Sequence, residues 1–161
     1  MLKYTTTEVV FREVPDEVTL AINISNCPIR CPDCHSKELW KDVGKDLTQR
    51  VIDRLIRENE GITCIAFMGG DSDPKHIELL ASAIKEHYPK LKIAWYSGNK
   101  ILPPDFNAKY FDYVKLGPYI KDRGPLDNPN TNQMLFKVSS DETGAVFELE
   151  NITSKFWKQD S

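Results

Sequence analysis

The sequence predicts an α/β fold in which a mostly parallel sheet carries a β-hairpin addition at each end of the chain. Two observations lead to this fold class. In the middle of the chain, short apolar runs of strand length alternate with helical patterns, which is typical of right-handed βαβ crossovers. Near both ends, pairs of strand-like stretches are separated by short polar turns, as in antiparallel hairpins. The 161 residues are close to the usual size of one domain.

The first half of the chain predicts a hairpin, a helix and a buried strand. Residues 4–11 and 17–24 are strand-like and flank a turn at Val14–Glu17. Residues 47–59 form an amphipathic helix that ends before a glycine, because four apolar residues recur on one stripe: Val51, Ile52, Leu55 and Ile56. The almost wholly apolar run at 62–68 is typical of a strand buried on both faces of a parallel sheet.

The second half begins with the best-signalled helix of the chain. Asp73 is suited to cap it and Pro74 to occupy its first position. Its apolar stripe consists of Ile77, Leu80, Ala81, Ile84 and Tyr88. Two further buried strands are predicted at 91–96 and 111–117, and a closing hairpin at 133–138 and 145–150.

Composition restricts the classes of function. The net charge of −3 and pI of about 5.6 provide no basic excess for a phosphate backbone, so we expect no nucleic-acid partner. The N-terminal 25 residues alternate polar and apolar residues, which argues against a signal peptide. No apolar run approaches the roughly 20 residues of a membrane helix. We therefore expect a cytoplasmic protein in which clustered cysteines bind metal or carry redox chemistry.

Three of the four cysteines lie within eight residues, in the pattern C-x3-C-x2-C formed by Cys27, Cys31 and Cys34. Three thiolates from one loop can hold three corners of an iron-sulfur cube and leave one iron open to a substrate. A structural zinc site with His35 or Cys64 as fourth ligand is the alternative. His35 directly follows Cys34, which makes a shared tetrahedron awkward, and a cysteine in an apolar run such as Cys64 is typically a small buried hydrophobe.

A glycine pair follows the buried strand at 62–68. Gly69 and Gly70 expose bare backbone groups at the carboxyl end of that strand, where α/β sheets bind ligands, and Asp71 adds an acceptor. The alternative is a tight turn with no ligand. His76 and His87, which follow on the next helix, are interpreted as ordinary surface residues.

The cysteine pattern and the glycine-glycine-acid turn together resemble the radical S-adenosylmethionine (SAM) superfamily. "CPDCHSKELW" with "MGGDSDP" is similar to the activases of glycyl radical enzymes. Within these, "AWYSG" and "GPYIKDRGPLDNPNTNQML" are most similar to activating proteins of anaerobic ribonucleoside-triphosphate reductases. The resemblance covers residues 18–135 and implies a single domain over 1–161 with an incomplete, TIM-like radical SAM barrel.

The resemblance also implies roles for particular residues. Cys27, Cys31 and Cys34 would ligate one 4Fe-4S cluster, whose open iron would chelate the amino and carboxylate groups of SAM. Candidate SAM contacts are Gly69, Gly70 and Asp71 at the methionine end, Asp33 and His35 at the adenine end, and Ser97. Asn132 and Gln133 would contribute to the pocket or to a partner surface. Some family members carry an Asp-Gly pair where this chain has Leu116-Gly117, with Lys115 nearby.

The implied activity is an oxidoreductase that cleaves SAM reductively and generates a glycyl radical on a partner enzyme. No general acid or base is required, so we assign no catalytic side chain. The implied partners are the anaerobic ribonucleoside-triphosphate reductase and a one-electron donor such as flavodoxin or ferredoxin. Two alternatives remain open: an activase for another target, such as pyruvate formate-lyase, or another small radical SAM enzyme; and, from another class, a zinc-stabilised binding module without catalysis.

Overall fold

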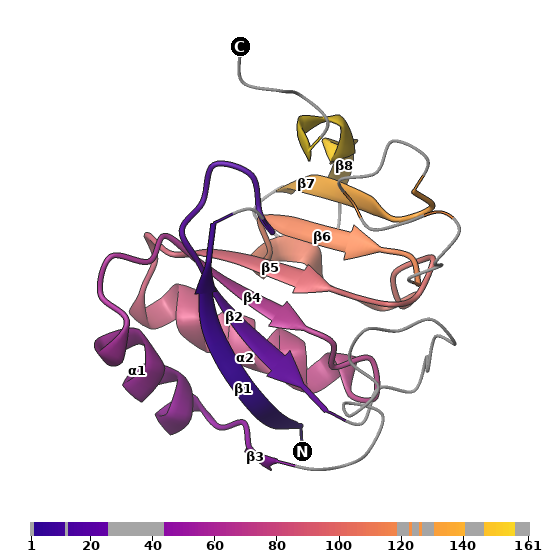
Figure 1. Ribbon diagram of the computed structural model, residues 1–161. Coiled ribbons are helices and arrows are strands. Elements are labelled where there is room, and N and C mark those ends of the chain that lie inside the picture. The colour runs from indigo at the N-terminus through magenta and orange to yellow at the C-terminus, as the bar shows by residue number, and fades with distance from the viewer. Residues whose placement is uncertain are drawn as a thin grey trace.

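The computed structural model describes residues 2–11, 13–25, 44–118, 123, 126, 131–140 and 147–156. In this part of the chain, one mixed sheet is accompanied by two α-helices (Figure 1). The strands are β1 (Lys3–Val10), β2 (Thr19–Ile24), β3 (Lys45–Asp46), β4 (Cys64–Met68), β5 (Lys92–Tyr96), β6 (Tyr113–Leu116), β7 (Met134–Ser140) and β8 (Phe147–Asn151). The helices are α1 (Gln49–Glu58) and α2 (Pro74–His87), and 3₁₀ helices occur at Ala108–Tyr110 and Thr153–Phe156.

The strand order is β3-β1-β2-β4-β5-β6-β7-β8. The central strands β2, β4, β5 and β6 are parallel neighbours, and the two predicted hairpins are confirmed as β1–β2 and β7–β8. The prediction of a mostly parallel sheet holds only for this centre. The described sheet also has antiparallel pairs on both flanks, because strands joined in a hairpin run in opposite directions.

The described sheet is open, because β3 and β8 stand at opposite ends of the order and do not pair with each other. The edge strand β3 was not predicted. It consists of two residues that pair with Lys3 and Tyr4 of β1, and two residues are too few to produce a recognisable pattern of alternation.

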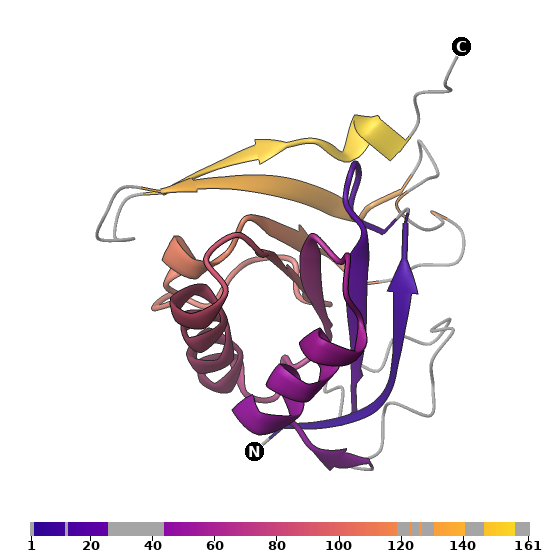
Figure 2. The same ribbon diagram turned by 90° about the vertical axis from the view of Figure 1, so that its left-hand side faces the viewer.

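Both helices lie against the same face of the sheet (Figure 2). The predicted start of α2 is confirmed, because Asp73 caps it through His76 N and Pro74 occupies the first turn. Helix α1 begins two residues later than predicted, at Gln49, and Thr48 caps it through Val51 N. The core between helices and sheet includes the fully buried side chains of Ile22, Ile52, Ile65, Phe67, Ile77, Ile84, Ile93 and Trp95. None of the described helices is long and apolar enough to cross a membrane.

The opposite face of the sheet carries small side chains at its centre. Ala21, Ala66 and Ala94 are in register across β2, β4 and β5, and all three are buried. Ala66 and Ala94 belong to a second apolar cluster with Val14, from the β1–β2 turn, and Ile152, which precedes the last 3₁₀ helix. Because alanine side chains are short, these two segments can pack closely onto this face.

Candidate functional site

The carboxyl ends of β2 and β4 lie on the same side of the sheet, which we call the carboxyl edge; the opposite side, where the parallel strands begin, is the amino edge. The two strands are parallel, and Asn23 of β2 pairs with Met68 of β4. A Cβ placed on Gly69 would lie 3.2 Å from the carbonyl oxygen of Ile24. The chain continues from Ser25 into residues 26–43, which lie outside the described residues together with Cys27, Cys31, Cys34, Asp33 and His35. Ile24, the last strand residue before this segment, therefore lies beside the glycine turn.

The turn after β4 is held by hydrogen bonds from β5 and α2. Gly69 and Gly70 have φ values of +108° and +92°, a region that favours glycine. The Gly69 amide donates to Tyr96 O at 3.0 Å, and the Trp95 indole donates to Gly69 O at 2.7 Å. Asp73 N donates to Gly70 O at 3.1 Å. In the described part of the chain, no group accepts a hydrogen bond from the amide of the buried Gly70.

Asp71 ties the turn after β4 to the turn after β5. Its Oδ1 accepts from the Ser97 hydroxyl and, at 3.3 Å, from Asn99 Nδ2, while its Oδ2 accepts from Gly98 N at 3.0 Å. Ser97 is buried, and its Oγ also accepts from Asn99 N. The structure thus brings Asp71 and Ser97 together, and the hydroxyl proton of Ser97 is used within the protein. A direct contact of either side chain with SAM stays a prediction.

The turn after β6 is joined to the same edge. The Gly117 amide donates to Asn99 O at 2.7 Å. The buried Lys115 ammonium donates to Ser97 O at 2.9 Å and to Gly117 O at 3.0 Å, and Gln133 Nε2 reaches Gly117 O at 3.4 Å. The turns at 69–71, 97–99 and 117–118 therefore form one hydrogen-bonded structure, which we call the rim.

Sequence reasoning missed two residues of the rim. The sequence pattern places Trp95 in a buried strand without a further role, and it predicts no role for Asn99. The signal for Trp95 was the polar N–H of an otherwise apolar side chain, because a buried indole usually finds an acceptor. For Asn99 the signal was an amide side chain directly after a Ser-Gly turn, a position where asparagine commonly bonds to backbone.

Cys64 lies far from the rim. It is the first residue of β4, where it pairs with Thr19 and Lys92 at the amino edge of the sheet. The five residues to Gly69 span about 16 Å at the usual strand rise. The thiol is fully buried, and burial raises its pKa to about 12. The interpretation of Cys64 as a buried hydrophobe is confirmed, and its distance from the rim argues against it as fourth ligand to a metal held there.

The histidines of α2 differ from each other. His87 is exposed, as predicted for a surface residue. His76 is partly buried, and its Nδ1 accepts from Leu2 N at 3.0 Å, so the prediction of an ordinary surface residue is wrong for it. Burial lowers the pKa of His76. Among the residues that the structure describes, no group of three or more His, Cys, Asp or Glu side chains is suited to hold a metal.

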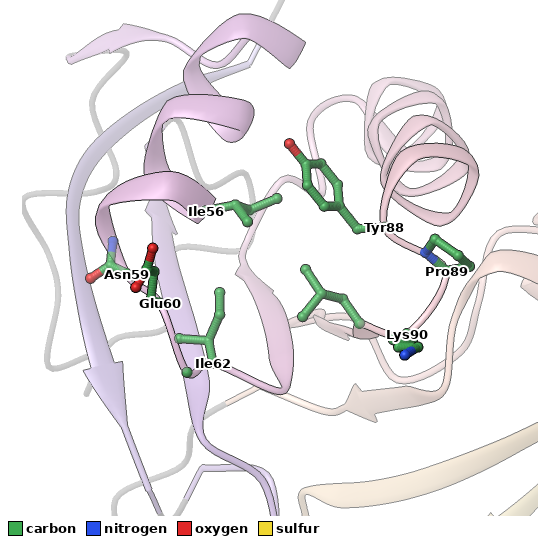
Figure 3. Close-up of a pocket in the computed structure, with 9 residues that line it drawn as sticks. Ile56, Asn59, Glu60, Ile62, Tyr88, Pro89 and Lys90 are labelled. Atoms are coloured by element: carbon green, nitrogen blue, oxygen red, sulfur yellow. The ribbon is translucent and has the colours of Figure 1, made fainter.

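A cleft of about 420 Å³ opens at the amino edge of the sheet, near the starts of β4 and β5 (Figure 3). It lies between the C-terminal ends of α1 and α2, and its apolar lining comes from Ile56, Ile62, Tyr88 and Leu91. It contains none of the predicted site residues. The predicted site residues that the structure describes lie at the rim and not at this cleft.

Comparison with known proteins gives one finding. A family model described as a 4Fe-4S single cluster domain matches residues 17–114. The matched region is more than half of the chain and contains the three clustered cysteines, the glycine turn, Asp71 and Ser97. No curated protein and no solved structure matches the chain.

Proposed function

The chain belongs to the 4Fe-4S single cluster domain family, and we propose that it is a radical SAM enzyme that generates a glycyl radical on a partner protein. The proposed partner is an anaerobic ribonucleoside-triphosphate reductase, and the proposed electron donor is a flavodoxin or ferredoxin. In this proposal the open sheet is an incomplete radical SAM barrel. The observation that carries it is that β2 and β4 end at the same side of the sheet, where Ile24, the last strand residue before the cysteine segment in sequence, lies beside the glycine turn.

The cluster is assigned to Cys27, Cys31 and Cys34. Three thiolates would leave one iron without a protein ligand, and SAM would be held at that iron. When bound, the cluster and SAM supply reductive cleavage of the sulfonium and removal of a hydrogen atom from the α carbon of a partner glycine. The protein supplies the groups that orient SAM.

The glycine turn fits the amino-acid end of SAM. The free Gly70 N–H is a donor for a carboxylate. The carbonyls of Gly69 and Gly70 each accept one hydrogen bond from the protein, and each keeps a second lone pair for an N–H of the SAM amino group. Asp71 accepts three hydrogen bonds, which leaves room for one more on a carboxylate with about four acceptor positions. Asp33 and His35 remain assigned to adenine.

The rim holds these atoms in place before a ligand arrives. Trp95 fixes the Gly69 carbonyl from the helix side of the sheet, and Lys115 joins the ends of β5 and β6. A preformed site avoids the cost of ordering loops on binding. At the same side of the sheet, Met134 pairs with Leu116 and is 45% exposed, and we assign it to the surface that contacts the partner protein.

The experiment is anaerobic reconstitution followed by two measurements. We expect iron and acid-labile sulfide near four of each per chain, and conversion of SAM to methionine and 5′-deoxyadenosine under reducing conditions. Cys31→Ala serves as the control that loses both. Mixing with a purified reductase should then give a glycyl radical signal in electron paramagnetic resonance.

Each negative result has its own meaning. A colourless protein with stoichiometric zinc refutes the proposal in favour of a binding module. SAM cleavage without a radical on the reductase leaves the chemistry standing and refutes the target. Repeating the last step with a pyruvate formate-lyase then tests the other activase alternative.

A further inference from the structure

Helix α1 carries a stripe of arginines on the side that faces away from the sheet. Arg50, Arg54 and Arg57 are all exposed, and at 3.6 residues per turn they lie within about 60° of one another around the helix axis. The buried residues Ile52 and Leu55 lie on the opposite side of the helix. The stripe therefore forms the solvent face of an amphipathic helix in the outer layer of the fold (Figure 2).

The three arginines differ in how they are held. Arg54 donates to Tyr4 OH at 3.0 Å and pairs with Glu58 at 3.7 Å. Among the residues that the structure describes, the side chains of Arg50 and Arg57 make no hydrogen bond or ion pair. Their charges are therefore available to a partner molecule, and Arg54 is fixed between them.

The strand before α1 adds one more positive side chain. Lys45 of β3 is exposed, and together with the three arginines it forms what we call the basic face. The exposed acids of β3 and α1 are Asp46 and Glu58, so four positive charges stand against two negative ones. Asp53 lies toward α2, where it accepts from Tyr88 OH at 3.2 Å. The whole chain has a net charge of −3, but salt screens exposed charges beyond about 10 Å, so an approaching protein responds to the local positive charge.

The basic face begins beside the cysteine segment. Residues 26–43 lie between β2 and Gly44 in the sequence, and Gly44 directly precedes Lys45. Lys45 pairs with Tyr4 of β1, and Tyr4 pairs with Ile24 at the end of β2. Two strand spacings, about 10 Å, thus separate β3 from β2. The described residues on either side of the cysteine segment therefore lie together at the carboxyl edge, where the basic face begins.

We propose that the basic face is the docking surface for the electron donor, a small redox protein with an acidic surface, an inference that rests on the proposed function. The donor gives up one electron and the cluster takes it up, so the donor must dock close to the cysteine segment. The basic face begins there, and its charge is opposite to that of such a donor. Complementary charges of this kind speed the encounter of two proteins and orient them.

The test measures binding of oxidised flavodoxin to the reconstituted protein by titration calorimetry. The variant combines Arg50→Glu with Arg57→Glu, because these two side chains support no contact of the described fold. At low salt the affinity should fall about tenfold, and the difference from wild type should shrink at about 0.2 M salt, where exposed charges are screened. Lys90→Glu combined with Lys137→Glu is the matched control. It changes the net charge equally, at exposed positions outside the basic face, and should bind as wild-type protein does.

A second arm separates docking from the chemistry. SAM cleavage driven by dithionite, a small reductant that needs no docking surface, should be the same in wild-type protein and in both double variants. Cleavage driven by reduced flavodoxin should slow only in the variant with Arg50→Glu and Arg57→Glu.

The outcomes distinguish this inference from the proposed function. Equal flavodoxin affinity of wild-type protein and the arginine variant overturns the inference, and so does an equal loss in the lysine control, because net charge then explains it. Wild-type protein that binds vesicles of phosphatidylserine through the arginines, and not flavodoxin, overturns it in favour of an anionic lipid surface. In these cases dithionite-driven cleavage leaves the proposed function standing. Failure of wild-type protein to cleave SAM with dithionite refutes the proposed function and this inference together.

Discussion

Replacing Asp71 with alanine tests whether the Asp71 carboxylate stabilises the fold in addition to any contact that it makes with a ligand. The Asp71 carboxylate accepts hydrogen bonds from Ser97, Gly98 and Asn99, which belong to the turn after the neighbouring strand. Hydrogen bonds to a charged group contribute about 1.5–3 kcal/mol each. The Asn99 bond is long at 3.3 Å, and the Asp71 side chain is only half-buried. We therefore count only the bonds from Ser97 and Gly98, each at about 1.5 kcal/mol. The free energy of unfolding of Asp71→Ala should then fall by about 3 kcal/mol.

The assay is urea denaturation of the cluster-free protein, followed by circular dichroism. A loss of about 3 kcal/mol corresponds to a melting temperature lowered by about 6–12 °C in a domain of this size. Asp105→Ala is the control, because Asp105 is 74% exposed and pairs with the exposed Lys75. Such a surface pair contributes at most about 1 kcal/mol. Equal stability of the two variants would refute the role of Asp71 as a tie.

Two further predictions concern residues away from the rim. Cys64→Ala should keep the full iron content and SAM cleavage. Its free energy of unfolding should fall by about 1–2 kcal/mol, because the substitution removes a buried side-chain atom. Loss of iron on metal analysis would show that Cys64 is a ligand. Stability should fall as pH falls below about 6.5, because the pKa of His76 is lowered in the folded protein and the unfolded chain binds the proton more readily. His76→Gln should flatten this slope in urea titrations between pH 7 and 5; an unchanged slope would assign it to other groups.

The sequence was most informative where a local pattern decides the structure. The run from Cys64 to Met68 is buried along nearly its whole length because β4 has neighbours on both sides and cores on both faces. Asp73 and Pro74 start α2 as their chemistry predicts. In these cases burial and capping depend on residues close together in sequence, and so the pattern is readable from one chain.

Contacts between residues far apart in the sequence could not be predicted from such local patterns. The Trp95 indole reaches Gly69, 26 residues away, and Asp71 reaches Ser97 over the same separation. Gly69 and Asp71 were expected at a site, but their partners depend on how β4 and β5 align. The register of two parallel strands is set by packing of the whole sheet, and a crossover helix permits several registers.

We expect the amino edge of the sheet to contribute to stability alone, and the rim to contribute to both stability and SAM binding. At the amino edge, the buried Glu17 binds Lys92 at 2.9 Å, Tyr113 OH at 3.3 Å and the Thr63 hydroxyl. These contacts fasten the β1–β2 turn to β5, to β6 and to the residue before β4. Glu17→Gln should therefore lower the free energy of unfolding by about 1–3 kcal/mol. The rim is built from different residues, so SAM affinity, measured by calorimetry well below the melting temperature, should not change. Asp71→Ala should lower both quantities, because loosening the rim adds an ordering cost to binding. A tenfold loss of SAM affinity in Glu17→Gln would show that the two edges are coupled through the strands.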